Sequence, residues 1–116
     1  MVMVFYPLDF SPICTNEMCA YRDDFSMFED RGARVLGISR DSTWTHKAFK
    51  ERHGLTHTLL ADMKGDVAKL YGCWNEVAGI AERLTVVIDK DGVVRYVEHN
   101  QPLEPRDQKK AAAALA

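Results

Sequence analysis

Apolar side chains along the first half of the chain predict strands and helices in alternation. An unbroken apolar run over residues 2–6 is typical of a buried strand. From Cys14 to about Arg31, apolar residues instead recur at three- and four-residue intervals, which predicts a helix with one buried face. The residues of that face are Met18, Tyr21, Phe25 and Phe28. A second buried strand is expected over residues 33–39.

A second helix is predicted to begin after Asp41 and Ser42, because such side chains cap helix N-termini. It is expected to end at Gly54. Its side chains expected on one side are Trp44, Ala48, Phe49 and Arg52. The short apolar run over residues 58–62 leads into a loop, and residues 66–72 predict a short helix that a glycine ends.

The last third of the chain predicts a β-hairpin followed by a helix. Residues 84–89 are rich in β-branched side chains, which favours a strand. The turn residues 89–92 then predict a hairpin, with residues 93–97 as the returning strand. After a break at Gln101 and Pro102, the alanine-rich segment 103–116 predicts a closing helix.

This order of elements predicts one domain over residues 1–116 with a thioredoxin-like α/β fold. A β-α-β unit comes first and a β-β-α unit comes last, so we expect a central mixed sheet flanked by helices. The loop after the first strand would then lie at the carboxyl end of that strand, where open α/β sheets usually bind ligands.

Composition and charge narrow the class of protein. The chain has 116 residues, 47% of them hydrophobic and 28% charged, as in an ordinary soluble domain. A formal net charge of −2 gives no basis for nucleic acid or an anionic membrane as partner, and no apolar run is long enough to span a bilayer. Three cysteines without framework spacing indicate thiol chemistry in a reducing compartment, and we expect the cytoplasm.

Cys14 is the residue with the clearest chemical potential. It follows a loop with prolines at positions 7 and 12 and stands where the first helix begins. Unpaired backbone N–H groups and the helix dipole favour a thiolate over a thiol at such a place. The alternative is a small buried hydrophobic residue, which is how most free cysteines behave, and position alone leaves both open.

The spacing around Cys14 resembles a known signature. Pro7, Ser11 and Cys14 form P-x-x-x-S-x-x-C, which is similar to the active-site signature of peroxiredoxins. Glu17 and Cys19 continue the resemblance toward the bacterioferritin-comigratory and alkyl hydroperoxide reductase E types. Residues 71–83 and 106–108 also resemble this family.

The resemblance implies a thiol peroxidase that reduces hydrogen peroxide and organic hydroperoxides without a cofactor or metal. Cys14 would attack the peroxide and become a sulfenic acid, with Arg83 stabilising the thiolate. Ser11 would donate its hydroxyl hydrogen to the peroxide, and Pro7 would shape and dry the pocket. The residues alone also allow a surface arginine at the start of a strand, a turn serine and a proline that only ends a strand.

Two further residues have supporting roles under this resemblance. Glu17 would hold arginines in a hydrogen-bond network, although it is equally a first-turn acid favoured by the helix dipole. Arg22 is predicted to be one of those arginines.

Cys19 is the predicted resolving residue, because it matches that position in one branch of the family. Five helical residues separate two Cα atoms by about 7.5 Å along the axis. A disulfide needs Cα atoms within about 7 Å, so a Cys14–Cys19 bond requires the helix to unwind locally. An external thiol is the alternative. Cys73 matches no catalytic position and is interpreted as incidental.

The expected partners are a peroxide substrate and a reductant, which is thioredoxin, a glutaredoxin-type protein or a small thiol. A homodimer is a further possibility, with Trp44 or Phe49 at the contact or in the core. The family normally carries an N-terminal segment before the first strand, so the domain is expected to be N-terminally truncated.

Three other functions use the same residues. One is a peroxide sensor or thiol-disulfide relay without efficient turnover. Another is a disulfide exchanger, which normally needs C-x-x-C where this chain has C-x₄-C. The third is a zinc module built from the three cysteines with His46, His53 and His57, which we instead expect to be solvated surface histidines.

Overall fold

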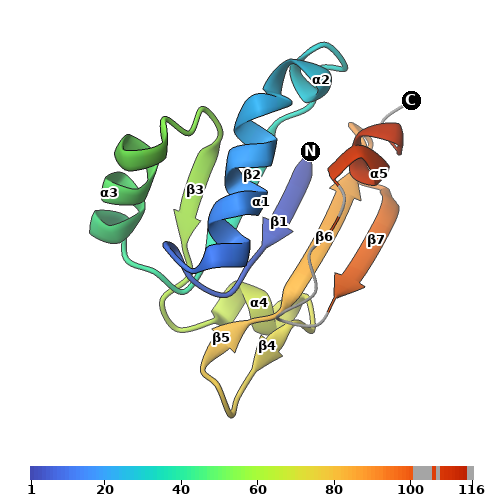
Figure 1. Cartoon of the computed structure of the whole chain (residues 1–116). Coiled ribbons are helices and arrows are strands. Elements are labelled where there is room, and N and C mark those ends of the chain that lie inside the picture. The colour runs from blue at the N-terminus through green and yellow to red at the C-terminus, as the bar shows by residue number, and fades with distance from the viewer. Residues whose placement is uncertain (101–105, 107, 115–116) are drawn as a thin grey trace.

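Five strands form the central sheet of the computed structural model, which describes residues 1–100, 106 and 108–114 (Figure 1). Their bounds are β1 Val2–Phe5, β2 Val35–Ser39, β3 Thr58–Ala61, β6 Arg83–Ile88 and β7 Val94–Asn100. The order across the sheet is β3-β2-β1-β6-β7. β1, β2 and β3 are parallel, whereas β6 is antiparallel to both β1 and β7. The predicted central mixed sheet is therefore confirmed.

The described helices are α1 Pro12–Asp23, α2 Phe25–Glu29, α3 Thr43–His53, α4 Asp66–Leu70 and α5 Gln108–Ala113. A small antiparallel pair, β4 Trp74–Asn75 and β5 Ile80–Ala81, precedes β6. Figure 1 shows α4 and this pair at the end of the sheet toward which β1 points. Among the described residues, none of the helices has the length and apolar character needed to cross a bilayer.

Side chains of β1 alternate between two cores, as the pleat of a strand requires. Val2, Val4 and Tyr6 belong to a cluster with residues of α1, α2, α3 and α5, among them Cys14. Met3 and Phe5 belong to a second cluster with α4 and Cys73 on the other face of the sheet. The two buried cysteines are thus separated by the sheet.

The first predicted helix is divided in two. Asp24 leaves helical geometry with φ −99° and ψ 18°, so that α1 ends at Asp23 and α2 begins at Phe25. Three of the four residues predicted for its buried face are buried, namely Met18, Tyr21 and Phe28. Phe25 lies at the break and is only partly buried.

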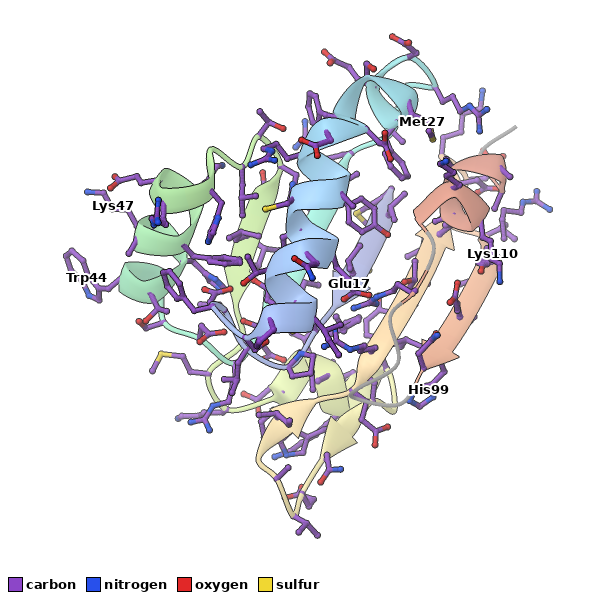
Figure 2. The ribbon with its side chains drawn as sticks, in the orientation of Figure 1. Glu17, Met27, Trp44, Lys47, His99 and Lys110 are labelled. Carbon is purple, nitrogen blue, oxygen red and sulfur yellow. The ribbon has the colours of Figure 1, made fainter. Side chains whose placement is uncertain are left out.

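The prediction that four side chains share one side of the second helix is wrong. Trp44 is 79% exposed, and Ala48 and Arg52 also face solvent, whereas Phe49 packs in the core with His46 beside it. Figure 2 shows Trp44 pointing away from the sheet on the outer side of α3. On the buried side of α3, Nδ1 of His46 lies 2.6 Å from Oδ2 of Asp9 in the loop after β1, a contact that the sequence of the helix does not reveal.

Two other features differ from the sequence-based expectation. Residues 58–61 form the edge strand β3, which pairs in parallel with β2, where only an apolar run before a loop was predicted. The β4–β5 pair was not predicted. The closing helix is observed as α5, while residues 101–105, 107 and 115–116 of the predicted break and helix lie outside the described residues.

We predict that Gly65→Ala destabilises the protein more than Gly92→Ala. Both glycines have positive φ, +71° and +79°, so alanine is strained at either position by about 1 kcal/mol or more. At Gly65 the new Cβ would also collide with the Trp74 ring, whereas nothing lies within 4 Å at Gly92. Overpacking should add about 1–3 kcal/mol to the loss at Gly65, measured by urea unfolding. Equal losses would contradict this packing.

Candidate active site

Cys14 lies in the first turn of α1, directly after the loop that leaves β1. Ser11 is the N-cap, with extended geometry (φ −70°, ψ 147°), and its carbonyl accepts the N–H of Thr15 at 2.8 Å. Pro12 is tolerated at the first helical position because its missing N–H would be unpaired there in any case. The side chain of Cys14 has no exposed surface. A buried sulfur therefore lies in the first turn of the helix.

Strand register places Arg83 beside Cys14. β1 and β6 pair with Phe5 opposite Leu84, so the preceding residue of β6 lies beyond the end of β1, where the loop to α1 begins. The Nη2 of Arg83 donates to Sγ of Cys14 at 3.2 Å, and this arginine is only 2% exposed. The predicted contact between Arg83 and Cys14 is present in the structure, and Arg83 is the first residue of β6.

Glu17 connects two buried arginines. Its Oε1 accepts a hydrogen bond from Nη1 of Arg83, and its Oε2 accepts from Nε and the backbone N–H of Arg106, each at 3.0 Å. Arg106 also donates to Oγ1 of Thr85 at 3.0 Å and to the carbonyl of Phe5 at 2.5 Å. Figure 2 shows Glu17 on α1 in the middle of the molecule. Among the described residues, two guanidinium groups share this carboxylate, and the positive charge of Arg83 beside Cys14 favours a thiolate there.

Arg22 does not belong to this network, which corrects its predicted role. Its Nε donates to Asp23 at 2.9 Å and its Nη1 donates to the carbonyl of His53 at 2.6 Å. It therefore ties α1 to the C-terminus of α3. Arg106 takes the place predicted for Arg22. In the sequence, residues 106–108 show only a resemblance to the family, which does not indicate this role for Arg106.

Ser11 and Pro7 shape the loop before α1. The hydroxyl of Ser11 donates to the carbonyl of Leu8 at 2.8 Å, which is the bond expected of a turn residue. Pro7 is buried directly after β1. Their roles toward a peroxide stay predictions.

Cys19 and Cys73 differ in their relation to Cys14. All three cysteines are free thiols. Cys19 is partly buried and lies five residues after Cys14 in the continuous helix α1, so the predicted need for unwinding stands as a prediction. Cys73 is buried on the opposite face of the sheet, and burial raises the pKa of its thiol to about 12. This second thiol is unsuited to attack a sulfenic acid at Cys14.

The expectation of solvated histidines is wrong for two of the three. His57 is buried, and burial together with the charge of Lys50 lowers its pKa to about 4. His46 is also buried, and its Nδ1 lies 2.6 Å from Oδ2 of Asp9. Sequence reasoning missed Asp9 and the burial of His46 beside it. The three-residue spacing of His46 and Phe49 on one helix was the available signal.

The zinc ligand set proposed from the sequence is not assembled. Among the described residues, the only group of three side chains that could hold a metal ion is Asp9, Asp41 and His46, and it contains no cysteine. These groups bond to one another and to their surroundings: Asp41 accepts the backbone N–H of Asp9 at 2.8 Å and the hydroxyl of Ser39 at 2.5 Å. The arrangement is that of a hydrogen-bond network.

Comparison with known sequences identifies relatives of this chain. A model of the AhpC/TSA family matches residues 1–97. Chloroplastic peroxiredoxin Q of Suaeda salsa is 44% identical over 102 residues, which cover 87% of this chain and 48% of that protein. Alkyl hydroperoxide reductase E of Mycobacterium tuberculosis is 42% identical over 118 residues, which cover 100% of this chain and 77% of that protein. The chain spans about half the length of the peroxiredoxin Q relatives.

Solved structures show the same fold. The crystal structure of peroxidoxin BcpB from Mycobacterium tuberculosis has a TM-score of 0.88 at 34% identity and covers 98% of this chain and 76% of that chain. The structure of Enterococcus faecalis AhpC has a TM-score of 0.92 at 27% identity and covers 98% and 71%. The predicted thioredoxin-like α/β fold, with a mixed sheet and flanking helices, is confirmed.

We predict that Glu17→Gln strongly destabilises the folded protein. The substitution keeps the side-chain volume but removes the carboxylate that pairs with Arg83 and Arg106, and breaking a buried ion pair costs about 3–5 kcal/mol. The matched control is Glu76→Gln, because Glu76 is exposed and lies 3.9 Å from Nζ of Lys69. That control should show no measurable change in urea unfolding. Similar losses in both variants would contradict the importance of the buried pair.

Proposed function

Because the chain belongs to the AhpC/TSA family of peroxiredoxins, we propose that it is a thiol peroxidase that reduces hydrogen peroxide and organic hydroperoxides through Cys14. The observation that supports this most directly is the 3.2 Å contact between Sγ of Cys14 and Nη2 of Arg83. A buried sulfur that accepts a guanidinium hydrogen bond at a helix N-terminus is stabilised as the nucleophilic thiolate.

The first step breaks the O–O bond of the peroxide. The Cys14 thiolate attacks one oxygen and forms an S–O bond, while the second oxygen leaves with the bonding electron pair and takes up a proton as water or alcohol. The sulfur is oxidised to sulfenic acid and the peroxide is reduced. Arg83 lies where negative charge moves from sulfur to the leaving oxygen, so the same guanidinium can stabilise both ends of that movement.

The burial of Cys14 limits which molecules reach it. Its side chain has no exposed surface, so even a small peroxide needs a shift of the covering residues. Pro7 and Ser11 belong to the loop next to Cys14 and are the residues proposed to shape that approach. In this proposal Ser11 exchanges its bond to the Leu8 carbonyl for one to the peroxide.

The second step forms a disulfide. The Cys19 thiolate attacks the sulfenic sulfur of Cys14, and hydroxide leaves and is protonated to water. The two residues lie in the continuous helix α1, so the first turns of that helix must unwind before the sulfurs meet.

The oxidised chain then needs an external reductant. We propose thioredoxin, a glutaredoxin-type protein or a small thiol, acting in a reducing compartment such as the cytoplasm. The three free cysteines fit that setting. Trp44 is the exposed residue proposed for a homodimer contact, because Phe49 is committed to the core.

Rapid mixing of the reduced protein with hydrogen peroxide tests the first step. Fast consumption of peroxide should disappear in Cys14→Ser and persist in Cys73→Ala, because Cys73 lies on the opposite face of the sheet. Arg83→Gln should lower the rate constant by about 10²–10³, the usual effect of removing one electrostatic donor. A wild-type rate no faster than that of free cysteine would exclude the peroxidase. Fast oxidation without turnover by added thiol reductants would favour the peroxide sensor.

Intact-mass analysis after one equivalent of peroxide tests the resolving residue. The wild type and Cys73→Ala should each lose the mass of two hydrogens, as one internal disulfide requires. Cys19→Ser should instead gain one oxygen at Cys14, because its sulfenic acid has no internal partner. A stable sulfenic acid in the wild type would assign resolution to an external thiol.

A further inference from the structure

The loop before α1 contains one strained residue. Phe10 has φ +67°, in the left-handed region that a bulky side chain rarely occupies. Such a conformation costs about 1–3 kcal/mol and persists only where surrounding contacts hold it. Phe10 directly precedes Ser11, the N-cap of α1, so its conformation sets where the helix carrying Cys14 begins.

The contacts that hold this loop come largely from α3 and the residues before it. The carboxylate of Asp9 accepts the hydroxyl of Tyr6 at 2.5 Å and lies 2.6 Å from Nδ1 of His46. The backbone N–H of Asp9 donates to Asp41 at 2.8 Å. The ring of Phe10 packs edge-on against Phe49, with centroids 5.0 Å apart. Asp9 and Phe10 are therefore both fixed by the same part of the fold.

Both ring nitrogens of His46 face hydrogen-bond acceptors. Nδ1 lies against the Asp9 carboxylate, and Nε2 lies 3.1 Å from the carbonyl oxygen of Leu60 in β3. A neutral imidazole carries only one N–H, whereas an imidazolium carries two and satisfies both acceptors. The side chain is 5% exposed, so water does not take over either role.

We propose that His46 is a buried imidazolium that clamps the loop ahead of Cys14 through Asp9, and that it is thereby a proton-dependent positioning residue for Cys14. The effect on peroxide reduction rests on the proposed function, while the protonation state and the clamp do not. Loss of the proton turns Nε2 into an acceptor that faces the Leu60 carbonyl. It also leaves the Asp9 carboxylate with an uncharged partner, so that the strained conformation of Phe10 loses support.

The surrounding charges agree with this geometry. Burial lowers the pKa of His46, but the hydrogen bond and the negative charge of Asp9 outweigh it, with smaller contributions from the Leu60 carbonyl and Asp41. The pKa is raised as a result. Tyr6 also lies against the ring, and it stays neutral because burial and Asp9 raise its pKa.

A raised pKa gives the clamp a definite pH dependence. Its stabilisation is fully present below the unfolded value of about 6.5 and is lost as pH rises through the folded pKa of His46. Ionisation of a cysteine alone would make the peroxide rate constant rise to a plateau with pH. The clamp instead predicts a descending limb above the folded pKa of His46.

Two measurements on the whole chain test the proposal. In the nuclear magnetic resonance spectrum of ¹⁵N-histidine-labelled protein, both ring nitrogens of His46 should be protonated at pH 6 and one should lose its proton in a single titration above about 6.5. In rapid mixing with hydrogen peroxide, the wild type should show the descending limb. The rate constant of His46→Gln should not fall with pH in that range, and its plateau should be about tenfold lower than that of the wild type. The matched control is His99→Gln, because His99 pairs with Glu82 at an exposed site and should leave the wild-type profile unchanged.

The outcomes separate this proposal from the peroxidase. A His46 ring with a single proton at pH 6 would overturn the clamp, as would a descending limb that survives in His46→Gln. If that variant does not fold, Asp9→Asn keeps the side-chain volume, removes the charge and should likewise abolish the limb and lower the His46 pKa. If the wild type is inert toward peroxide, the proposed function fails, while the titration of the ring nitrogens in wild type and Asp9→Asn still supports or overturns the clamp.

Discussion

The carboxylate of Glu17 joins three parts of the chain that are far apart in sequence. It lies on the buried face of α1 and accepts hydrogen bonds from Arg83, 66 residues later, and from Arg106, 89 residues later. All three charged side chains are buried, so each is stable in the fold only while the others are in place. The start of α1, the beginning of β6 and Arg106 are therefore fixed relative to one another by one acid. Cys14 lies within this arrangement and meets a positive environment that the fold itself maintains.

The position of the Cys14 sulfur relative to Arg83 depends on the register of β1 with β6 and on where α1 begins. Antiparallel pairing of β1 with β6 determines the face of the sheet on which the Arg83 side chain lies, because a register shift of one residue would turn it to the opposite face. The position of Cys14 along α1 depends on where the helix starts, which follows from the left-handed Phe10 and the Ser11 cap. The 3.2 Å contact between the Cys14 sulfur and the Arg83 guanidinium thus depends both on the strand register, which places Arg83, and on the start of α1, which places Cys14. Neither of these alone would place the two groups together.

The sequence was sufficient to predict the Cys14 motif, the hairpin and the buried face of α1, because each depends on residues that are close together in the chain. The spacing around Cys14 identified the site, and the family resemblance connected it with Arg83 and Glu17, which the structure brings together. Periodicity located the buried face of α1, and β-branched residues with a turn signal located the strands of the hairpin. Periodicity failed for α3, where the partner of His46 comes from residue 9. The family resemblance led to Arg22, where the structure has Arg106 beside Glu17. Which of several arginines reaches a buried acid depends on chain packing over long separations, and no periodicity carries that information.

The geometry of α1 sets two requirements of the proposed cycle against each other. Glu17 stands between Cys14 and Cys19 in the helix, so unwinding that brings the two sulfurs together also withdraws Glu17 from its arginines. The group that maintains the charge balance of the reduced site therefore opposes the step that forms the disulfide. In the proposed cycle, oxidation of Cys14 to a neutral sulfenic acid removes the charge attraction between its sulfur and Arg83. The helix start is then held less firmly after the chemical step than before it, which is the order that a cycle of attack followed by unwinding requires.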